Sequence, residues 1–137
     1  MTYLVDTNVF SRLLLPEAPP ALVERYDLER ERGELATAGL VLHEIRFGAE
    51  LLPARSRRRA VILEYLARQV GILPVLPYEE SAAIWHAEER ARLRRRGESP
   101  PFADGQIAAI AAVNRLTLVT GNVRDFASFR GLTVQSW

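Results

Sequence analysis

The 137-residue chain contains no cysteine, and its 18 basic residues are all arginine, so lysine is absent as well. Without cysteine there are no disulfides, no thiolate nucleophiles and no zinc or iron–sulfur sites built on thiolates. Without lysine, Walker-type phosphate loops and Schiff-base enzymes are excluded. The chain has only two histidines, His43 and His86. Carboxylates are therefore the main side chains left for catalysis.

Long hydrophobic runs are also missing. No segment approaches the roughly 18 consecutive apolar residues that a membrane span needs, and the first residues lack the basic and then apolar pattern of a signal peptide. We therefore expect a cytoplasmic protein with no membrane partner. The length and the hydrophobic fraction of 48% predict one domain, residues 1–137, with a substantial core.

The formal net charge is only +1, but arginine is concentrated in one part of the chain. Residues 55–97 hold ten arginines against five acidic residues. Such a segment forms either solvated helix faces or a surface that faces a polyanion such as nucleic acid. Composition alone leaves both interpretations open.

Apolar patterns and turn residues predict alternating strands and helices. The predicted strands are 3–6, 35–37, 72–76, 117–120 and 132–135, and the predicted helices are 8–14, 20–32, 40–52, 56–70, 78–96 and 102–116. Pro74 indicates a sheet edge or a strand end, and the helix 102–116, apolar almost all round, should be central. This alternation favours a three-layer α/β/α domain with a central parallel sheet of four to five strands.

Acidic residues occupy unusual places in this pattern. Asp6 ends the first strand, and parallel sheets bind ligands at the carboxyl ends of their strands. The alternative is that Asp6 caps the following helix, but Asn8 can also serve as that cap. In helix 40–52 we expect Leu40, Phe47 and Leu51 to face the core, and Glu44 to point with these apolar positions. A buried carboxylate must be paired, protonated or bound to a metal, so an ion pair with an arginine is the alternative for Glu44.

Two further regions add oxygen ligands. Asp104 stands in the first turn of the apolar helix 102–116, and Thr120, Asn122 and Asp125 follow the strand 117–120. The last two residues are also common in turns and helix caps. Together with Asp6 and Glu44, these side chains form an all-oxygen set of the kind that binds Mg²⁺ or Mn²⁺.

Four segments resemble, in order and spacing, the PIN domain, and in particular the VapC and FitB toxins of prokaryotic toxin–antitoxin pairs. These segments are Leu-Val-Asp6-Thr-Asn8-Val, His-Glu44-Ile-Arg-Phe-Gly48, Ala-Asp104-Gly-Gln-Ile-Ala-Ala and Val-Thr120-Gly-Asn122-Val-Arg-Asp125-Phe. The resemblance runs from the first predicted strand to the last. Each motif is weak alone, but four in order are a strong signal.

The resemblance implies a Mg²⁺- or Mn²⁺-dependent endoribonuclease that is often a homodimer and is inhibited by a cognate VapB/FitA-like antitoxin. It implies catalytic and metal-binding roles for Asp6, Glu44, Asp104 and Asn122, with Thr120 as the usual hydroxyl and Asn8 in support. The sequence departs from the family in having Asn122 at the fourth position and no Ser or Thr shortly before Glu44. It leaves open whether one or two metals bind and whether Asn122 or Asp125 is the fourth ligand.

In the hydrolytic interpretation the acids hold a metal that activates water for attack on an RNA phosphodiester bond. Either Asp104 or Asp6 could orient that water. The alternative is a non-catalytic RNA-binding or protein-interaction module on the same fold. A phosphatase of the haloacid-dehalogenase type is excluded, because Asn8 stands where its second Asp is needed and lysine is absent.

Overall fold

The computed structural model describes the backbone of residues 1–137 and the side chains of all of them except residue 69. Its centre is a five-stranded sheet in the order β3-β2-β1-β4-β5, in which all neighbouring strands are parallel. The strands are β1 (Tyr3–Val5), β2 (Leu35–Ala38), β3 (Val75–Leu76), β4 (Thr117–Val119) and β5 (Val134–Gln135). The predicted parallel sheet is confirmed, and β3, whose segment is interrupted by Pro74, lies at its edge.

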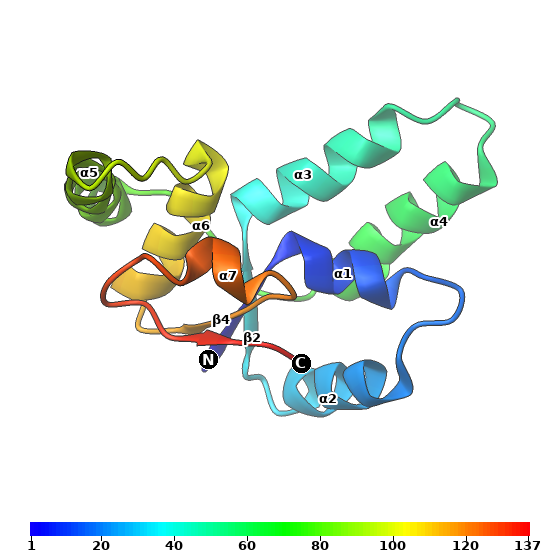
Figure 1. Ribbon diagram of the computed structural model, residues 1–137. Helices are drawn as coiled ribbons and strands as arrows, with labels where there is room; N and C mark the ends of the chain where they lie inside the picture. Colours follow the sequence, from blue (N-terminus) through cyan, green and yellow to red (C-terminus); the bar gives the residue numbers. More distant parts are fainter.

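Helices cover both faces of the sheet. They are α1 (Thr7–Leu13), α2 (Pro20–Glu31), α3 (Gly39–Glu50), α4 (Arg57–Tyr65), the π-helical η1 (Leu66–Val70), α5 (Glu80–Arg95), α6 (Phe102–Val113) and α7 (Val123–Phe126). Figure 1 shows α1 to α4 on one side of the sheet and α5 to α7 on the other. In the part of the chain that the structure describes, none of these helices has the length and apolar character to cross a bilayer.

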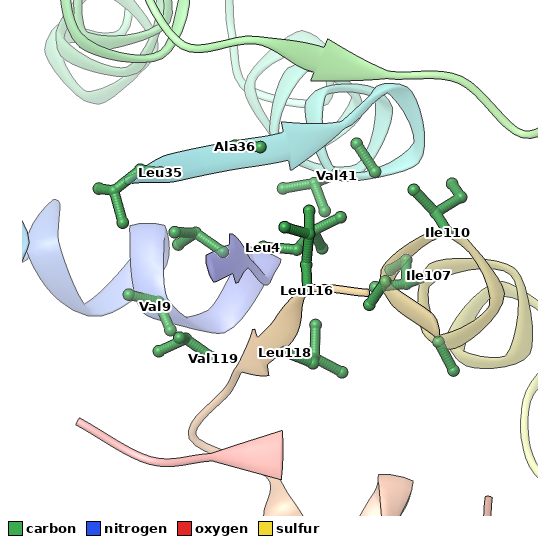
Figure 2. Packing of buried hydrophobic residues seen from close by; sticks show 14 of the residues in the cluster. Leu4, Val9, Leu35, Ala36, Val41, Ile107, Ile110, Leu116, Leu118 and Val119 are labelled. Atoms are coloured by element: carbon green, nitrogen blue, oxygen red, sulfur yellow. The ribbon is translucent and has the colours of Figure 1, made fainter. Parts of the chain in front are cut away.

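The core lies between the sheet and the helices nearest to its middle. Leu4 of β1 and Leu118 of β4 have no exposed surface, and Figure 2 shows them between Val9 of α1 and Ile107 of α6. The predicted central position of α6 is confirmed, because six of its consecutive or near-consecutive residues are buried: Gly105, Ile107, Ala108, Ala109, Ile110 and Ala111. Small alanine side chains let this helix approach the strands closely.

Because the chain moves from β1 to β2 on one face and reaches β4 on the other, the strand order reverses between β1 and β4. In open parallel sheets, ligands bind outside the carboxyl ends of the strands at such a switch point. The carboxyl end of β1 is followed by Asp6 and that of β4 by Thr120. The fold thus brings two of the predicted site segments to its expected binding edge.

Local boundaries differ from the sequence prediction where a single residue changes the backbone. The cap of α1 is Asp6, whose side chain accepts from the Thr7 amide, and the expectation that Asn8 caps this helix is wrong. Helix α6 ends at Val113, before the predicted Leu116, because Arg115 has a left-handed φ of 56°. The short helix α7 was not predicted, since its four residues give no periodic signal.

The predicted core face of α3 is also wrong. Phe47 is 56% exposed and Leu51 is 70% exposed, whereas Val41, Ile45 and Ala49 are buried. Both sets recur at helical spacing, so periodicity could not distinguish them. Glu44 therefore borders the buried face and does not lie among the exposed residues of the other stripe.

Candidate active site

Asp6 is the centre of the hydrogen-bonded network at the switch point. It is 6% exposed, and its two carboxylate oxygens have different donors. Oδ1 accepts from the Thr7 amide at 2.7 Å, and Oδ2 accepts from the Thr120 hydroxyl at 2.8 Å. The pairing of Val5 with Val119 in the parallel register puts Asp6 and Thr120 next to each other. Asp6 is therefore both a helix cap and a carboxylate with a fixed direction.

Asn8 and Thr120 tie α1 to the loop after β4. The Asn8 amide donates to the Thr120 hydroxyl at 3.0 Å, and its Oδ1 accepts from the Gly121 amide at 2.8 Å. The Thr120 hydroxyl also accepts from the Asn122 amide at 3.1 Å. One donated and two accepted bonds use the full capacity of a hydroxyl. The supporting roles predicted for Asn8 and Thr120 agree with these bonds.

Glu44 reaches the same region from α3. Its side chain is half-buried, and its Oε2 accepts a short hydrogen bond from the Thr7 hydroxyl. Among the described side chains no arginine forms an ion pair with Glu44, which removes the ion-pair alternative. Sequence reasoning missed Thr7, although its place between Asp6 and Asn8 was a signal. No Ser or Thr stands shortly before Glu44, and the hydroxyl of Thr7 on α1 provides the hydrogen-bond donor in its place.

Asp104 lies in the first turn of α6 and has the most perturbed carboxyl group of the site. Its pKa is raised from 3.8 to about 6, first by burial and then by the charges of Asp6, Asp125 and Glu44. Burial also raises the pKa of Asp6, with Glu44 and Asp125 adding to it, and the bonds from Thr120 and Thr7 oppose the shift. Four carboxylates from four segments are thus close enough to repel one another.

The two candidates for the fourth ligand lie at the start of α7 and both are exposed. Asn122 occupies the position before the helix without capping it through its side chain, and Asp125 lies in its first turn. Asp125 contributes its charge to both Asp6 and Asp104. It lines a hollow of about 450 Å³ whose other lining residues are Glu98, Ser99, Pro100, Pro101, Arg124 and Ser128.

A second hollow lies against Glu44 on the other side of the acids. It has a volume of about 300 Å³ and is formed by α1, α3 and α4, with the lining residues Thr7, Ser11, Leu14, Glu44, Ile45, Gly48, Leu52, Arg58 and Ile62. Each hollow therefore combines a candidate metal-binding carboxylate with an arginine.

The donor set fits a hard divalent cation in its chemistry. All candidate ligands are carboxylate or amide oxygens, and the charges that raise the pKa of Asp104 are all negative. Among the described side chains, however, no three His, Cys, Asp or Glu residues stand together as a ready-made metal cage. Magnesium commonly binds through one or two carboxylates and keeps several waters, so a preformed cage is not required.

The arginine-rich segment is divided between two environments. Arg59, Arg68 and Arg92 form ion pairs with Glu50, Glu64 and Glu89. Arg90 instead lies over the Phe102 ring at 4.9 Å from its centroid. Part of the segment is thus a set of paired helix faces, and Arg90 of α5 packs on the first residue of α6.

Comparison with known proteins agrees with this arrangement. The PIN domain model matches residues 3–132. The chain is 31% identical to the tRNA(fMet)-specific endonuclease VapC of Salmonella typhimurium, over 100% of this chain and 98% of that protein. It is 33% identical to toxin FitB of Neisseria gonorrhoeae, over 92% and 89% of the two chains.

A solved structure extends the likeness to three dimensions. DNA-bound VapBC from Salmonella typhimurium contains a chain that superposes with a TM-score of 0.82 at 30% identity, covering 100% of this chain and 98% of that one. The matching fold, the full-length coverage and the four motifs at the switch point lead to one assignment. The chain belongs to the PIN domain family and is a homologue of the VapC and FitB toxins.

Proposed function

We propose that this protein is a divalent-cation-dependent endoribonuclease that acts as the toxin of a toxin–antitoxin pair. The observation that carries the proposal is the gathering of Asp6, Glu44, Asp104 and Asp125 at the switch point, where the charges among the described side chains that shift the pKa of Asp104 are all carboxylates. Carboxylates that serve only the fold are normally paired. The ribonuclease and endonuclease names of its full-length relatives support the same activity.

In this function Asp6, Glu44 and Asp104 would hold Mg²⁺ or Mn²⁺, with Asn122 or Asp125 as a further ligand. The bound cation would supply a Lewis acid for the phosphate and lower the pKa of a bound water. Thr120 and Thr7 hold the carboxylates of Asp6 and Glu44 in fixed directions. The pKa of Asp104 is about 6 without a cation; a bound cation would favour its ionised form, in which the carboxylate could orient the attacking water.

The partners follow from the same site. RNA would lie across the two hollows, where Arg124 and Arg58 stand beside the acids and can contact phosphates. An inhibitory antitoxin of the VapB/FitA kind is proposed because the relatives include a toxin and a VapBC complex. Such an inhibitor would place a basic side chain among the acids and compete with the cation. A homodimer is proposed from the family resemblance.

The test is cleavage of RNA by the purified, antitoxin-free protein, with Mn²⁺ or with a chelator. Mixed cellular RNA and an initiator tRNA are the substrates, the second because a relative is named for it. We expect internal cuts that appear with Mn²⁺, disappear with chelator and are lost in Asp104→Asn. Mapping the cut ends gives the site preference.

Binding of RNA without Mn²⁺-dependent cutting would instead favour the non-catalytic module. The Asp104→Asn variant controls for a contaminating nuclease, because a contaminant would cut equally in both preparations. Cutting that survives in chelator would contradict the role of the cation.

A further inference from the structure

Asp104 differs from the other acids in how it is held. Asp6 accepts from Thr7 and Thr120, and Glu44 accepts from Thr7. In the part of the chain whose side chains are described, Asp104 has no hydrogen bond or ion pair. Its position therefore depends on where the first turn of α6 lies. That turn packs against α5, which makes the most extensive helix contact of α6.

The two helices approach each other very closely at Gly105, the residue after Asp104. A β-carbon added to Gly105 would lie 2.1 Å from Nε2 and 2.7 Å from Cδ2 of His86. Real β-carbon contacts are essentially never this short, so any side chain here would push the helices apart. Glycine at this position allows the imidazole ring of α5 to lie directly on the backbone of α6.

The His86 ring is itself fixed. It is 3% exposed, and its Nδ1 is 3.1 Å from the Tyr78 hydroxyl in a hydrogen bond. Its ring centroid is 4.8 Å from that of Phe102, the first residue of α6. Burial and the nearby Arg90 lower the pKa of His86, so the ring is largely neutral at pH 7 and adds no cation to the site.

Helix α5 therefore holds α6 on both sides of Asp104. On one side His86 and Arg90 contact the Phe102 ring, and on the other His86 contacts Gly105. A shift of the first turn by even about 1 Å would move the Asp104 carboxylate relative to the fixed Asp6, and misplacements of this size cost about 100-fold in catalysis.

We propose that His86 and Gly105 are positioning residues that set Asp104 in register with Asp6 and Glu44 for binding the divalent cation. This inference rests on the proposed function. The pair acts through Asp104 and touches neither cation nor RNA. Its contribution is the close contact of an imidazole with a glycine backbone, fixed by Tyr78 and Phe102.

The experiment uses the full chain and compares Gly105→Ala, His86→Ala and the combination of both with the wild type. Mn²⁺ affinity is measured by titration calorimetry with Mn²⁺ alone, and kcat and KM are measured on RNA. Gly39→Ala is the matched glycine control, because a β-carbon there meets nothing within 4 Å. Leu22→Ala, in the buried face of α2 at the far end of the sheet, is the control for general loss of stability.

We expect Gly105→Ala to weaken Mn²⁺ binding and lower kcat by about 10- to 100-fold, as changes behind a metal ligand do, with KM for RNA changed less than about threefold. The same Gly105→Ala change should cost less than about threefold when His86 is already alanine, because the methyl group then has space. His86→Ala alone should weaken Mn²⁺ binding by about 3- to 10-fold. Leu22→Ala should lower the melting temperature and leave Mn²⁺ affinity unchanged.

Wild-type Mn²⁺ affinity in both single variants would overturn the inference, as would an equal effect of Gly105→Ala with and without His86. Should Gly105→Ala fail to fold, His86→Ala still decides, because it removes a ring and creates no clash. A wild type that neither binds Mn²⁺ nor cuts RNA would overturn the proposed function, and this inference with it. The two failures are therefore distinguishable by the wild-type arm.

Discussion

Glu50 and Asp104 show how differently this chain treats its carboxylates. Glu50, at the end of α3, accepts from Arg46 at 2.7 Å and from Arg59 at 3.1 Å, and these bonds lower its pKa. Asp104, at the start of α6, has burial and three other carboxylates around it, and its pKa rises to about 6. With 18 arginines in the chain, the difference is not caused by a shortage of cations.

This difference shows that the repulsion between carboxylates is concentrated at the candidate active site. Arginine neutralises several other acids of the chain, as Arg25 and Arg32 do for the buried Glu29. Among the described side chains, Asp6, Glu44 and Asp104 form no ion pair, and their mutual repulsion opposes folding in the absence of a cation. A cluster that costs stability and whose carboxylates are not paired with arginine is the arrangement expected of a cation-binding site.

The largest expected effect is the loss of activity when a charge is removed from the switch point. We predict that Asp6→Asn and Glu44→Gln each lower Mn²⁺-dependent RNA cleavage by about 100-fold or more, equivalent to about 2.7 kcal/mol of transition-state stabilisation. The reason is that each substitution removes an anionic oxygen from the cation. Initial rates at saturating Mn²⁺ provide the measurement.

Glu50→Gln is the matched control, since it removes the same charge from the helix that carries Glu44. It should leave cleavage within about threefold of wild type, because Glu50 is paired with arginine and takes no part in the site. If Glu44→Gln and Glu50→Gln had the same small effect on cleavage, the conclusion that Glu44 takes part in the reaction and Glu50 does not would be wrong.

A smaller effect concerns stability without metal. We predict that Asp104→Asn raises the melting temperature in chelator, whereas Mn²⁺ stabilises the wild type much more than this variant. The rise in the pKa of Asp104 from 3.8 to about 6 corresponds to at most about 3 kcal/mol of free energy of unfolding. Solvent screening of this half-buried group reduces the stability that Asp104→Asn should gain to about 1 to 2 kcal/mol. Thermal unfolding with and without Mn²⁺ measures both parts.

The pH dependence fixes the sign of this effect. The folded state binds the Asp104 proton more tightly than the unfolded chain does, since its pKa is about 6 instead of 3.8. The ionised Asp104 therefore destabilises the folded protein fully above pH 6. This destabilisation declines between pH 6 and pH 4 and is absent below pH 4. The advantage of Asp104→Asn over wild type should shrink as the pH falls from 7 to 4. A variant less stable than wild type at pH 7 would contradict the repulsion.

Most of the fold could be predicted from the sequence because its signals are local. The strand runs and the apolar helix 102–116 predicted the right kinds of element, and Pro74 indicated the edge position of β3 as one of two alternatives. The orientation of α3 could not be predicted, since Leu40, Phe47 and Leu51 have the same helical spacing as Val41, Ile45 and Ala49. Which stripe is buried depends on the neighbouring helices and not on the stripe itself.

The candidate site shows a similar division. The acids were found because Asp6 closes a strand and Asp104 interrupts an apolar helix, both of which are visible in sequence. The bond from Thr7 to Glu44 joins residues 37 positions apart, and the contact of His86 with Gly105 joins α5 to α6. These partners depend on side-chain placement across elements, which no spacing rule provides.

The smallest expected effect is a difference in melting temperature between variants of two carboxylates, Asp125 of the acidic cluster and Asp27 of a surface ion pair. Asp125 is exposed. Its negative charge raises the pKa of Asp104, but less than the negative charge of Asp6 does. We predict that Asp125→Asn raises the melting temperature in chelator by about 1 °C, as expected for a weak exposed charge interaction. Asp27→Asn, which removes the ion pair of Arg30 with Asp27 at 3.3 Å, should lower the melting temperature by a similar amount. Paired scanning calorimetry at low ionic strength, where screening is weakest, measures the two signs. A lower melting temperature for Asp125→Asn as well would place Asp125 outside the repulsive cluster and leave Asn122 as the candidate for the fourth ligand.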